Sequence, residues 1–276
     1  MLVDVDKAWD KLYAKLKDDD LLVPDKDTTA SVSFFVKMRR AAAIAVLCIC
    51  SGAIVLYLNL QKEKETIVSI YNGEITNTLV STLEDGSIVY LSAGGTLACP
   101  ETFASEKRQV SLRGEALFDV NSDKNRPFLI ETEPALVEIT GTELNIKTAG
   151  KESFELSVLH GSVNVTLKTT GIPLRVESGE TVRLQSGRLQ KSLLSDRQRF
   201  DRYMQKMQFK DERLEHIVRV IQKISGKSVL LSDDTLKDME ITIAFDHNTV
   251  EEMIGLLCEV MNLNYTDNEN EIIIGR

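Results

Sequence analysis

The chain has 276 residues, of which 43% are hydrophobic and 6% aromatic, and it carries a formal net charge of −9 at pH 7. This length can hold two small domains in addition to a membrane segment. The acidic balance argues against direct binding of nucleic acid, which requires a clustered basic surface.

Residues 1–40 form a tail that is too short to bury an independent core. Within it, apolar residues recur at helical spacing at Val5, Trp9, Leu12 and Leu16. We predict an exposed amphipathic helix that docks into a partner's groove through Trp9, Leu12 and Leu16. The alternative interpretation is a partly ordered tail beside a membrane.

An uncharged apolar run extends from Ala41 to Leu60 and has about the length of one bilayer crossing. Lysine and arginine are more frequent before this run than after it, which favours an N-terminus on the cytoplasmic side. We therefore predict a transmembrane helix at 41–60, a cytoplasmic tail at 1–40 and a long exterior region. A cleaved signal peptide is disfavoured because 40 residues precede the run. A buried core helix is the other alternative.

From about Thr66 to Ser195 the apolar residues alternate with a period of two, which is typical of strands. The clearest alternating runs are Ser87–Leu91, Arg108–Leu112, Phe154–Val158, Ser162–Leu167, Pro173–Val176 and Thr181–Leu184. Turn signals such as Asp85-Gly86, Arg113-Gly114 and His160-Gly161 fall between them. We predict an all-β domain over residues 61–195, built as a sandwich, roll or solenoid.

Residues 196–276 change to a helical period. Apolar residues at helical spacing lie in two stretches, Leu214–Ile224 and Val250–Met261. Asp211 is expected to cap the first helix, and Thr249–Glu252 has the pattern of a capping box for the second.

Phe209 and Phe245 precede these two stretches at the same offset, which indicates an internal repeat. Strands are expected at Ser228–Leu231 and Glu240–Phe245, and a hairpin around Asn268–Asn270. We therefore predict a small α+β domain over 196–276, made of two β-α-β units packed around one core.

No sequence motif of enzymatic chemistry is present. The chain lacks a P-loop, a GxGxxG after a strand, HExxH and GxSxG. Its three histidines lie in different predicted elements without the spacing of metal ligands, and its four cysteines form neither a CxxC pair nor a zinc pattern. We therefore expect no enzyme activity, no cofactor and no metal.

The all-β region resembles the FecR domain, with matching segments in the same order across the region. These segments are Thr82–Leu97, Arg108–Val120, Pro127–Thr132, Val137–Thr148, Leu156–Val165 and Val176–Leu184. Residues 196–276 are similar to the domain that follows FecR domains in the Bacteroidetes type of these proteins, and to the short secretin and TonB N-terminal fold.

The resemblance implies a single-pass protein of the bacterial inner membrane with a periplasmic C-terminus. FecR-type proteins relay a signal from an outer-membrane TonB-dependent transducer to an extracytoplasmic-function sigma factor. The expected function is therefore that of an anti-sigma factor or sigma regulator. The tail resembles the last part of the longer cytoplasmic region of the family, so Trp9, Leu12 and Leu16 become the expected sigma contacts.

Two alternatives stay open. The chain can instead be a membrane-anchored periplasmic scaffold or ligand-binding module without sigma binding. Glu115, in the GEALF segment, is either a partner contact or a polar residue that satisfies a turn.

Overall fold

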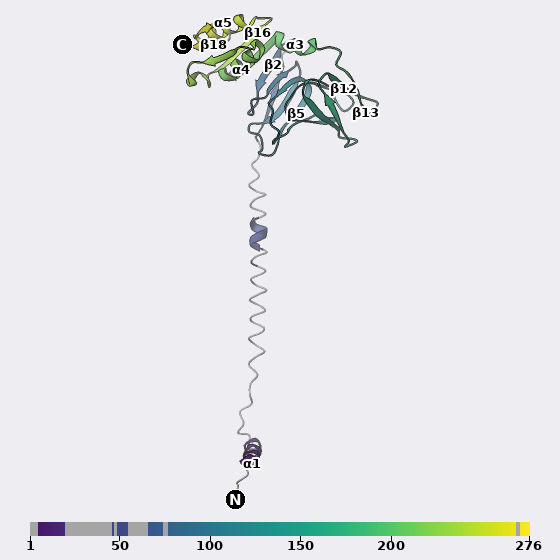
Figure 1. The fold of residues 1–276 in the computed structure, drawn as a ribbon, viewed down its shortest axis with the longest axis vertical. Coiled ribbons are helices and arrows are strands. Elements are labelled where there is room, and N and C mark those ends of the chain that lie inside the picture. The colour runs from purple at the N-terminus through teal and green to yellow at the C-terminus, as the bar shows by residue number, and fades with distance from the viewer. Residues whose placement is uncertain (1–4, 20–45, 47–48, 55–65, 74–76, 269–270) are drawn as a thin grey trace. The chain divides into compact units, whose positions relative to one another are not determined.

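The computed structural model describes residues 5–19, 46, 49–54, 66–73, 77–268 and 271–276 (Figure 1). The chain divides into two units, residues 1–64 and residues 65–276. Each unit is considered by itself below.

In the first unit, the predicted amphipathic stretch forms helix α1 (Val5–Asp18). Asp6 lies in its first turn and Lys15 and Lys17 in its last, which complements the helix dipole. The predicted transmembrane segment 41–60 lies largely outside the described residues; of it, residues 46 and 49–54 are helical. Among the described residues, no helix has the length and apolar character needed to span a membrane.

The second unit contains two large sheets. The first sheet has the strand order β1-β4-β5-β6-β7-β10-β11. Its neighbouring strands are antiparallel except β5 and β6, which are parallel. The bounds are β1 (Ile67–Tyr71), β4 (Thr96–Pro100), β5 (Arg108–Val120), β6 (Phe128–Glu131), β7 (Ala135–Ile139), β10 (Ser162–Leu167) and β11 (Pro173–Glu177).

The second sheet has the order β16-β14-β2-β3-β5-β8-β9-β12-β13. Here β14 and β2 are parallel and the other neighbours antiparallel. The remaining bounds are β2 (Thr78–Thr82), β3 (Ile88–Leu91), β8 (Thr142–Thr148), β9 (Phe154–His160), β12 (Glu180–Gln185), β13 (Arg188–Leu193), β14 (Lys206–Arg213) and β16 (Glu240–Asp246).

Strand β5 belongs to both sheets. Its first half pairs with β4 and β6, and its second half, from Gly114 onward, pairs with β3 and β8. Gly114 has φ +95°, and a Cβ there would lie 2.9 Å from the Cα of Gly95. The predicted turn at Arg113-Gly114 is therefore wrong: glycine permits a bend inside one continuous strand, by which β5 crosses from one sheet to the other.

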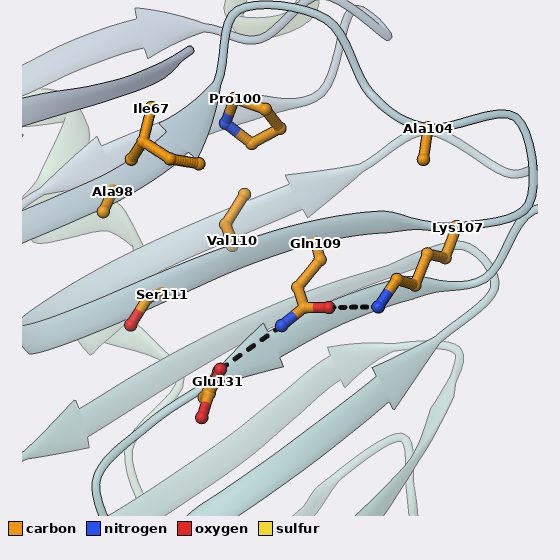
Figure 2. Close-up of a pocket in the computed structure, with 9 residues that line it drawn as sticks. All are labelled: Ile67, Ala98, Pro100, Ala104, Lys107, Gln109, Val110, Ser111 and Glu131. Carbon is orange, nitrogen blue, oxygen red and sulfur yellow. Dashed lines mark hydrogen bonds between the residues drawn. The ribbon is translucent and has the colours of Figure 1, made fainter. Parts of the chain in front are cut away.

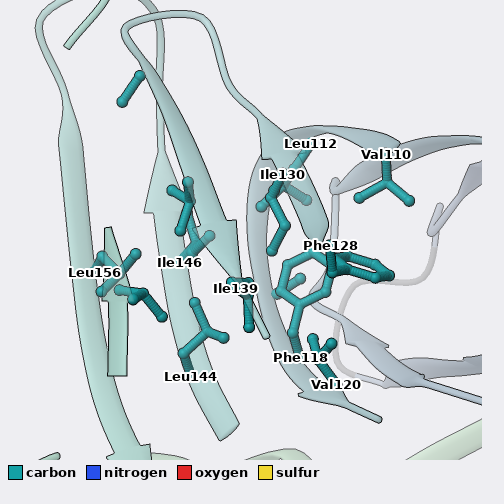
Figure 3. Packing of buried hydrophobic residues seen from close by; sticks show 14 of the residues in the cluster. Val110, Leu112, Phe118, Val120, Phe128, Ile130, Ile139, Leu144, Ile146 and Leu156 are labelled. Carbon is teal, nitrogen blue, oxygen red and sulfur yellow. The ribbon is translucent and has the colours of Figure 1, made fainter. Parts of the chain in front are cut away.

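The two sheets pack face to face as a sandwich, which confirms the all-β prediction for this region. Inward-facing residues of both sheets fill the core between them, including Val110, Leu144, Ile146 and Leu156 (Figure 3). Phe128 lies edge-on to Phe118, with 6.5 Å between ring centroids. All the alternating runs of the sequence lie in strands of this sandwich.

The C-terminal region repeats a strand-helix-strand pattern, as predicted. Helix α3 (Gln198–Gln205) leads into β14, and α4 (Leu214–Ser225) and α5 (Val250–Met261) cover a third sheet of order β15-β18-β17. Its strands are β15 (Ser228–Leu231), β17 (Asn264–Asp267) and β18 (Glu271–Gly275), and a short 3₁₀ helix, η1, spans Asp234–Leu236.

Of the two N-terminal caps predicted for α4 and α5, one is confirmed and one is wrong. The capping box of Thr249 and Glu252 is present at the start of α5. The predicted cap by Asp211 is wrong, because Asp211 has φ +48° inside β14 and the N-cap of α4 is Arg213. Asp211 instead accepts a hydrogen bond from the Thr242 hydroxyl at 3.0 Å, where the β14–β16 register shifts.

The sandwich and the C-terminal region share a second core. Val80, Ile88, Tyr90 and Leu117, on the outer face of the second sheet, are buried together with residues of α3, α4, α5 and their strands. In β3, Val89 and Leu91 face the sandwich core while Ile88 and Tyr90 face this second core. The boundary predicted near residue 195 therefore lies inside one compact unit.

Candidate partner-binding site

The apolar stripe of α1 is the surface that sequence reasoning selected. Successive residues of a helix are turned by about 100°, so Val5, Trp9, Leu12 and Leu16 share one face. Within α1 no residue is buried, and Trp9 and Leu12 are 63% and 49% exposed. Tyr13, which is also exposed, flanks the stripe.

An exposed stripe of this composition suits recognition by a hydrophobic groove. Helix-in-groove complexes use apolar anchors three or four residues apart, and Val5, Trp9, Leu12 and Leu16 follow this rule at i, i+4, i+7 and i+11. Tryptophan is enriched among the residues that carry most of the energy of an interface. The stripe can therefore bind a protein partner, and it offers no group for chemical catalysis.

Two of the FecR-like segments, Thr82–Leu97 and Arg108–Val120, meet at a buried ion pair in the sandwich. Arg108 Nη1 donates to Asp85 Oδ2 at 2.6 Å, and the two side chains are 1% and 4% exposed. Asp85 also accepts the Ser87 backbone N–H and hydroxyl, at 3.0 and 2.7 Å. Arg108 donates further to the carbonyls of Asn121 and Arg126. The pair therefore ties the Asp85-Gly86 turn to the start of β5, and its role is structural.

The Asp85-Gly86 turn also contacts helix α4. Gly86 has φ +78°, and a Cβ there would lie 2.6 Å from Arg219 Nη1. One turn further along α4, Lys223 forms an ion pair with Asp119 of β5. The turn predicted at Asp85-Gly86 is confirmed, and its positive φ is the reason that glycine suits this position.

Glu115 lies in the middle of β5 and faces α3. It accepts a hydrogen bond from the Tyr203 hydroxyl at 3.0 Å and forms an ion pair with Lys147 at 3.2 Å. Asn145, fully buried, donates to the same hydroxyl at 2.6 Å. Burial, together with the Glu115 carboxylate, raises the pKa of Tyr203. Glu115 thus contacts a segment of its own chain, and it does not lie in a turn.

Sequence reasoning missed Tyr203. The stretch Ser195–Lys206 is so rich in charge that it suggests only a change of composition. A detectable signal is the i, i+3 spacing of the two aromatic residues Phe200 and Tyr203, which places them on one face of a helix. Phe200 and Tyr203 are the buried residues of α3.

A second contact between α3 and the sandwich joins Arg199 to Glu155 of β9. Arg199 Nη1 and Arg183 Nε donate to the two carboxylate oxygens of Glu155, at 2.5 and 2.8 Å. Desolvation raises the pKa of Glu155, but the hydrogen bonds and charges of the two arginines outweigh it, so the pKa lies below the usual 4.5.

A lowered carboxyl pKa stabilises the fold above that usual value, and the stabilisation is lost as the pH falls through the folded-state pKa. We expect Glu155→Gln to be less stable than the native chain near pH 7, and the difference to shrink between about pH 6 and about pH 3. Urea denaturation across this range measures it. A stability difference that stays constant with pH would contradict this assignment.

A hollow of about 260 Å³ lies on the outer face of the first sheet (Figure 2). Ile67, Ala98 and Pro100 form its apolar side. Its polar side is a chain of hydrogen bonds in which Lys107 Nζ donates to Gln109, at 2.7 Å, and Gln109 donates to Glu131, at 3.2 Å. Glu131 also forms an ion pair with Lys168, at 2.8 Å, so the polar groups of the hollow are bonded to neighbours within the chain.

A larger hollow, of about 760 Å³, lies among the hairpin turns at one end of the sandwich. Leu167 and Leu184 contribute apolar surface, and the turns add two lysines and two glutamates, Lys151, Lys168, Glu133 and Glu152. This mixed lining selects for neither sign of charge. It is where a ligand would bind if the chain were a ligand-binding module.

Among the residues that the structure describes, no group of His, Cys, Asp or Glu is arranged to hold a metal ion. The histidines lie far apart in the chain and pair with local carboxylates: His160 contacts Glu143 at 3.2 Å and His216 contacts Glu212 at 2.6 Å.

Comparison with known families gives a match for the sandwich and a match for the C-terminal region. Residues 70–164 match the family described as FecR protein, and residues 206–274 match the family described as FecR, C-terminal. Together these matches cover more than half of the chain. The chain belongs to the FecR family. In this FecR-family chain, Asp85, Arg108 and Glu115 lie in the matched regions and contact other segments of the fold.

Two crystal structures of candidate anti-sigma factors from Parabacteroides distasonis are similar to this FecR-family chain. Their sequence identities are 23% and 25%, with TM-scores of 0.46 and 0.45. Each match covers 76% of this chain and 99% of the crystallised chain. The comparison with curated proteins gave no match.

Proposed function

We propose that the chain is an anti-sigma factor, or sigma regulator, that acts by binding partners and performs no chemistry. Membership of the FecR family supports this proposal. The single observation that carries it is the exposed apolar stripe of α1, with Trp9 at its centre. In this proposal the stripe lies in the groove of an extracytoplasmic-function sigma factor.

The proposal includes a place and a direction for the signal. Residues 41–60 anchor the chain in the bacterial inner membrane, with α1 in the cytoplasm and residues 65–276 in the periplasm. The excess of lysine and arginine before residue 41 supports this orientation. The periplasmic unit receives the signal from an outer-membrane TonB-dependent transducer. Co-purification of the full chain with the transducer's periplasmic signalling domain tests this part, and no association at micromolar concentrations would count against it.

Trp9→Ala is expected to weaken binding of the sigma factor encoded nearest the gene by at least about tenfold, because an aromatic anchor in a groove contributes about 2 kcal/mol or more. The measurement is titration calorimetry between residues 1–40 and the sigma factor. Leu12→Ala and Leu16→Ala should weaken binding in the same direction by smaller factors.

The matched control is Lys11→Ala, on the face of α1 opposite the stripe. Lysine and alanine both have high helix propensity, so this substitution keeps the helix. It should change the affinity by less than about threefold. If a folded, active sigma factor fails to bind the native tail, the anti-sigma proposal is wrong, and the anchored scaffold or ligand-binding module becomes the better proposal. Equal effects of Trp9→Ala and Lys11→Ala would exclude the stripe as the contact.

A further inference from the structure

Strand β1 is an edge of the first sheet with an apolar and exposed surface. It pairs with β4 on one side, and no described residue pairs with it on the other. Ile67 and Tyr71 are 56% and 64% exposed, and Val68 is exposed as well. An edge strand of this kind is a ready template for a further strand.

The other edge strands of the two large sheets carry features that discourage pairing. Charged residues or proline occur in β11, β13 and β16, at Pro173, Arg175, Glu177, Arg188, Lys191, Glu240 and Asp246. Strand β1, with the sequence Ile-Val-Ser-Ile-Tyr, has neither. For a chain with a net charge of −9, an uncharged edge is the place where two copies approach with least repulsion.

The hydrogen-bond pattern shows which residues of β1 face outward. The Thr66 carbonyl accepts from the Glu101 N–H, and the Asn72 N–H donates to the Gly95 carbonyl, so even-numbered residues bond toward β4. Because the direction alternates along an antiparallel strand, Ile67, Ser69 and Tyr71 direct their backbone groups to the open edge.

We propose that two copies of the chain associate through β1, paired antiparallel about a two-fold axis at Ser69. In this register Ser69 faces Ser69 of the second copy, and Ile67 faces the copy's Tyr71. These are hydrogen-bonded pairs, so the outward backbone groups of both strands are satisfied. The first sheets of the two copies become one continuous sheet.

The side chains fit this pairing. Ile67 and Tyr71 lie on the outer face of the sheet, so each pair sets an aromatic ring against a β-branched side chain, a favourable cross-strand combination. The ring of the copy's Tyr71 comes to lie against Ile67, at the rim of the hollow lined by Ala98 and Pro100 (Figure 2). A five-residue strand buries less surface than a stable standard interface, so the association is weak and concentration-dependent. It is separate from the sigma-binding proposal, because it uses no residue of α1.

Cross-linking through a cysteine at Ser69 tests the register. The full chain, in mild detergent and with Cys48 and Cys50 replaced by serine, carries Ser69→Cys and is treated with a short thiol cross-linker. The remaining cysteines, Cys99 and Cys258, are buried. The paired residues are about 5.5 Å apart, so we expect a covalent dimer at a yield at least about tenfold above the control.

The matched control is Ser111→Cys, an exposed serine in register with Ser69 across β4. Two such positions in the proposed dimer are about 24 Å apart, beyond the cross-linker's reach. Ser69→Lys, which places two charges together on the axis, should remove the association in sedimentation equilibrium while Ser111→Lys retains it. Equal yields from the two cysteines, no dimer from Ser69→Cys, or an unchanged association in Ser69→Lys would each overturn the proposal.

Discussion

Replacing Asp85 with alanine is expected to lower the free energy of unfolding by about 3 kcal/mol or more, because the Arg108 guanidinium is left in the protein interior without its counter-charge. Arg108 retains its hydrogen bonds to the carbonyls of Asn121 and Arg126 and its place over the Phe128 ring, 5.3 Å from the centroid. These contacts keep the effect near the lower end of the range for broken buried pairs. Chemical denaturation followed by circular dichroism measures it.

A double variant separates two effects of Asp85→Ala: the unpaired charge of Arg108 and the lost hydrogen bonds from Ser87 in the turn. Arg108→Met in the Asp85→Ala background removes the unpaired charge while keeping most of the side-chain volume, so it should recover a large part of the lost stability. If the double variant is as unstable as the sum of the two single ones, the charge is not the cause. Glu152→Ala, an exposed carboxylate in a hairpin, is the matched control and should change stability by less than about 0.5 kcal/mol.

Leu117→Ala is expected to destabilise the chain by about 3 kcal/mol, through the cavity it leaves in the second core. The effect specific to this fold is where in the chain the destabilisation is felt. Leu117 belongs to β5 of the sandwich, yet it is part of the same buried cluster as residues of α4 and α5. Hydrogen exchange of the amides of these two helices should therefore accelerate in the variant.

Leu112→Ala is the matched control for this measurement. Leu112 lies in the same strand and is equally buried, but it faces the sandwich core. Its substitution should be comparably destabilising, with the added exchange concentrated in the sandwich strands. If Leu117→Ala leaves α4 and α5 as protected as in the native chain, the shared core does not hold the C-terminal region in place.

Much of the fold is predictable because it depends on local periodicity. The alternating runs lie in strands, and Val5–Leu16 is helical. The two C-terminal stretches of helical period form α4 and α5, whose apolar faces are buried. What periodicity does not give is which strands become neighbours. The parallel pairing of β14 with β2 joins residues far apart in sequence, and no local pattern encodes it.

A clue to this arrangement is nevertheless present in β3. The run Ser87–Leu91, which we interpreted as alternating, has no polar residue after Ser87, so Ile88–Leu91 lacks the alternation of a strand that has one face in water. It indicates burial on both faces, but it does not identify the second layer. The candidate sites also differ in how far local sequence predicts them. The helical spacing of apolar residues predicts the apolar face of α1, whereas the Glu115–Tyr203 contact depends on tertiary packing. The sigma-binding role of Trp9, Leu12 and Leu16 stays a prediction.

The shared core has a consequence for how the chain folds as it is synthesised. When the ribosome has completed the sandwich, Ile88, Tyr90 and Leu117 still have no covering layer, because α4 and α5 come last. The nascent chain then carries an apolar patch on an otherwise finished sheet, and such patches bind chaperones or aggregate. A gene truncated after residue 195 would leave this state permanent. Premature termination should therefore yield an insoluble sandwich rather than a smaller working protein.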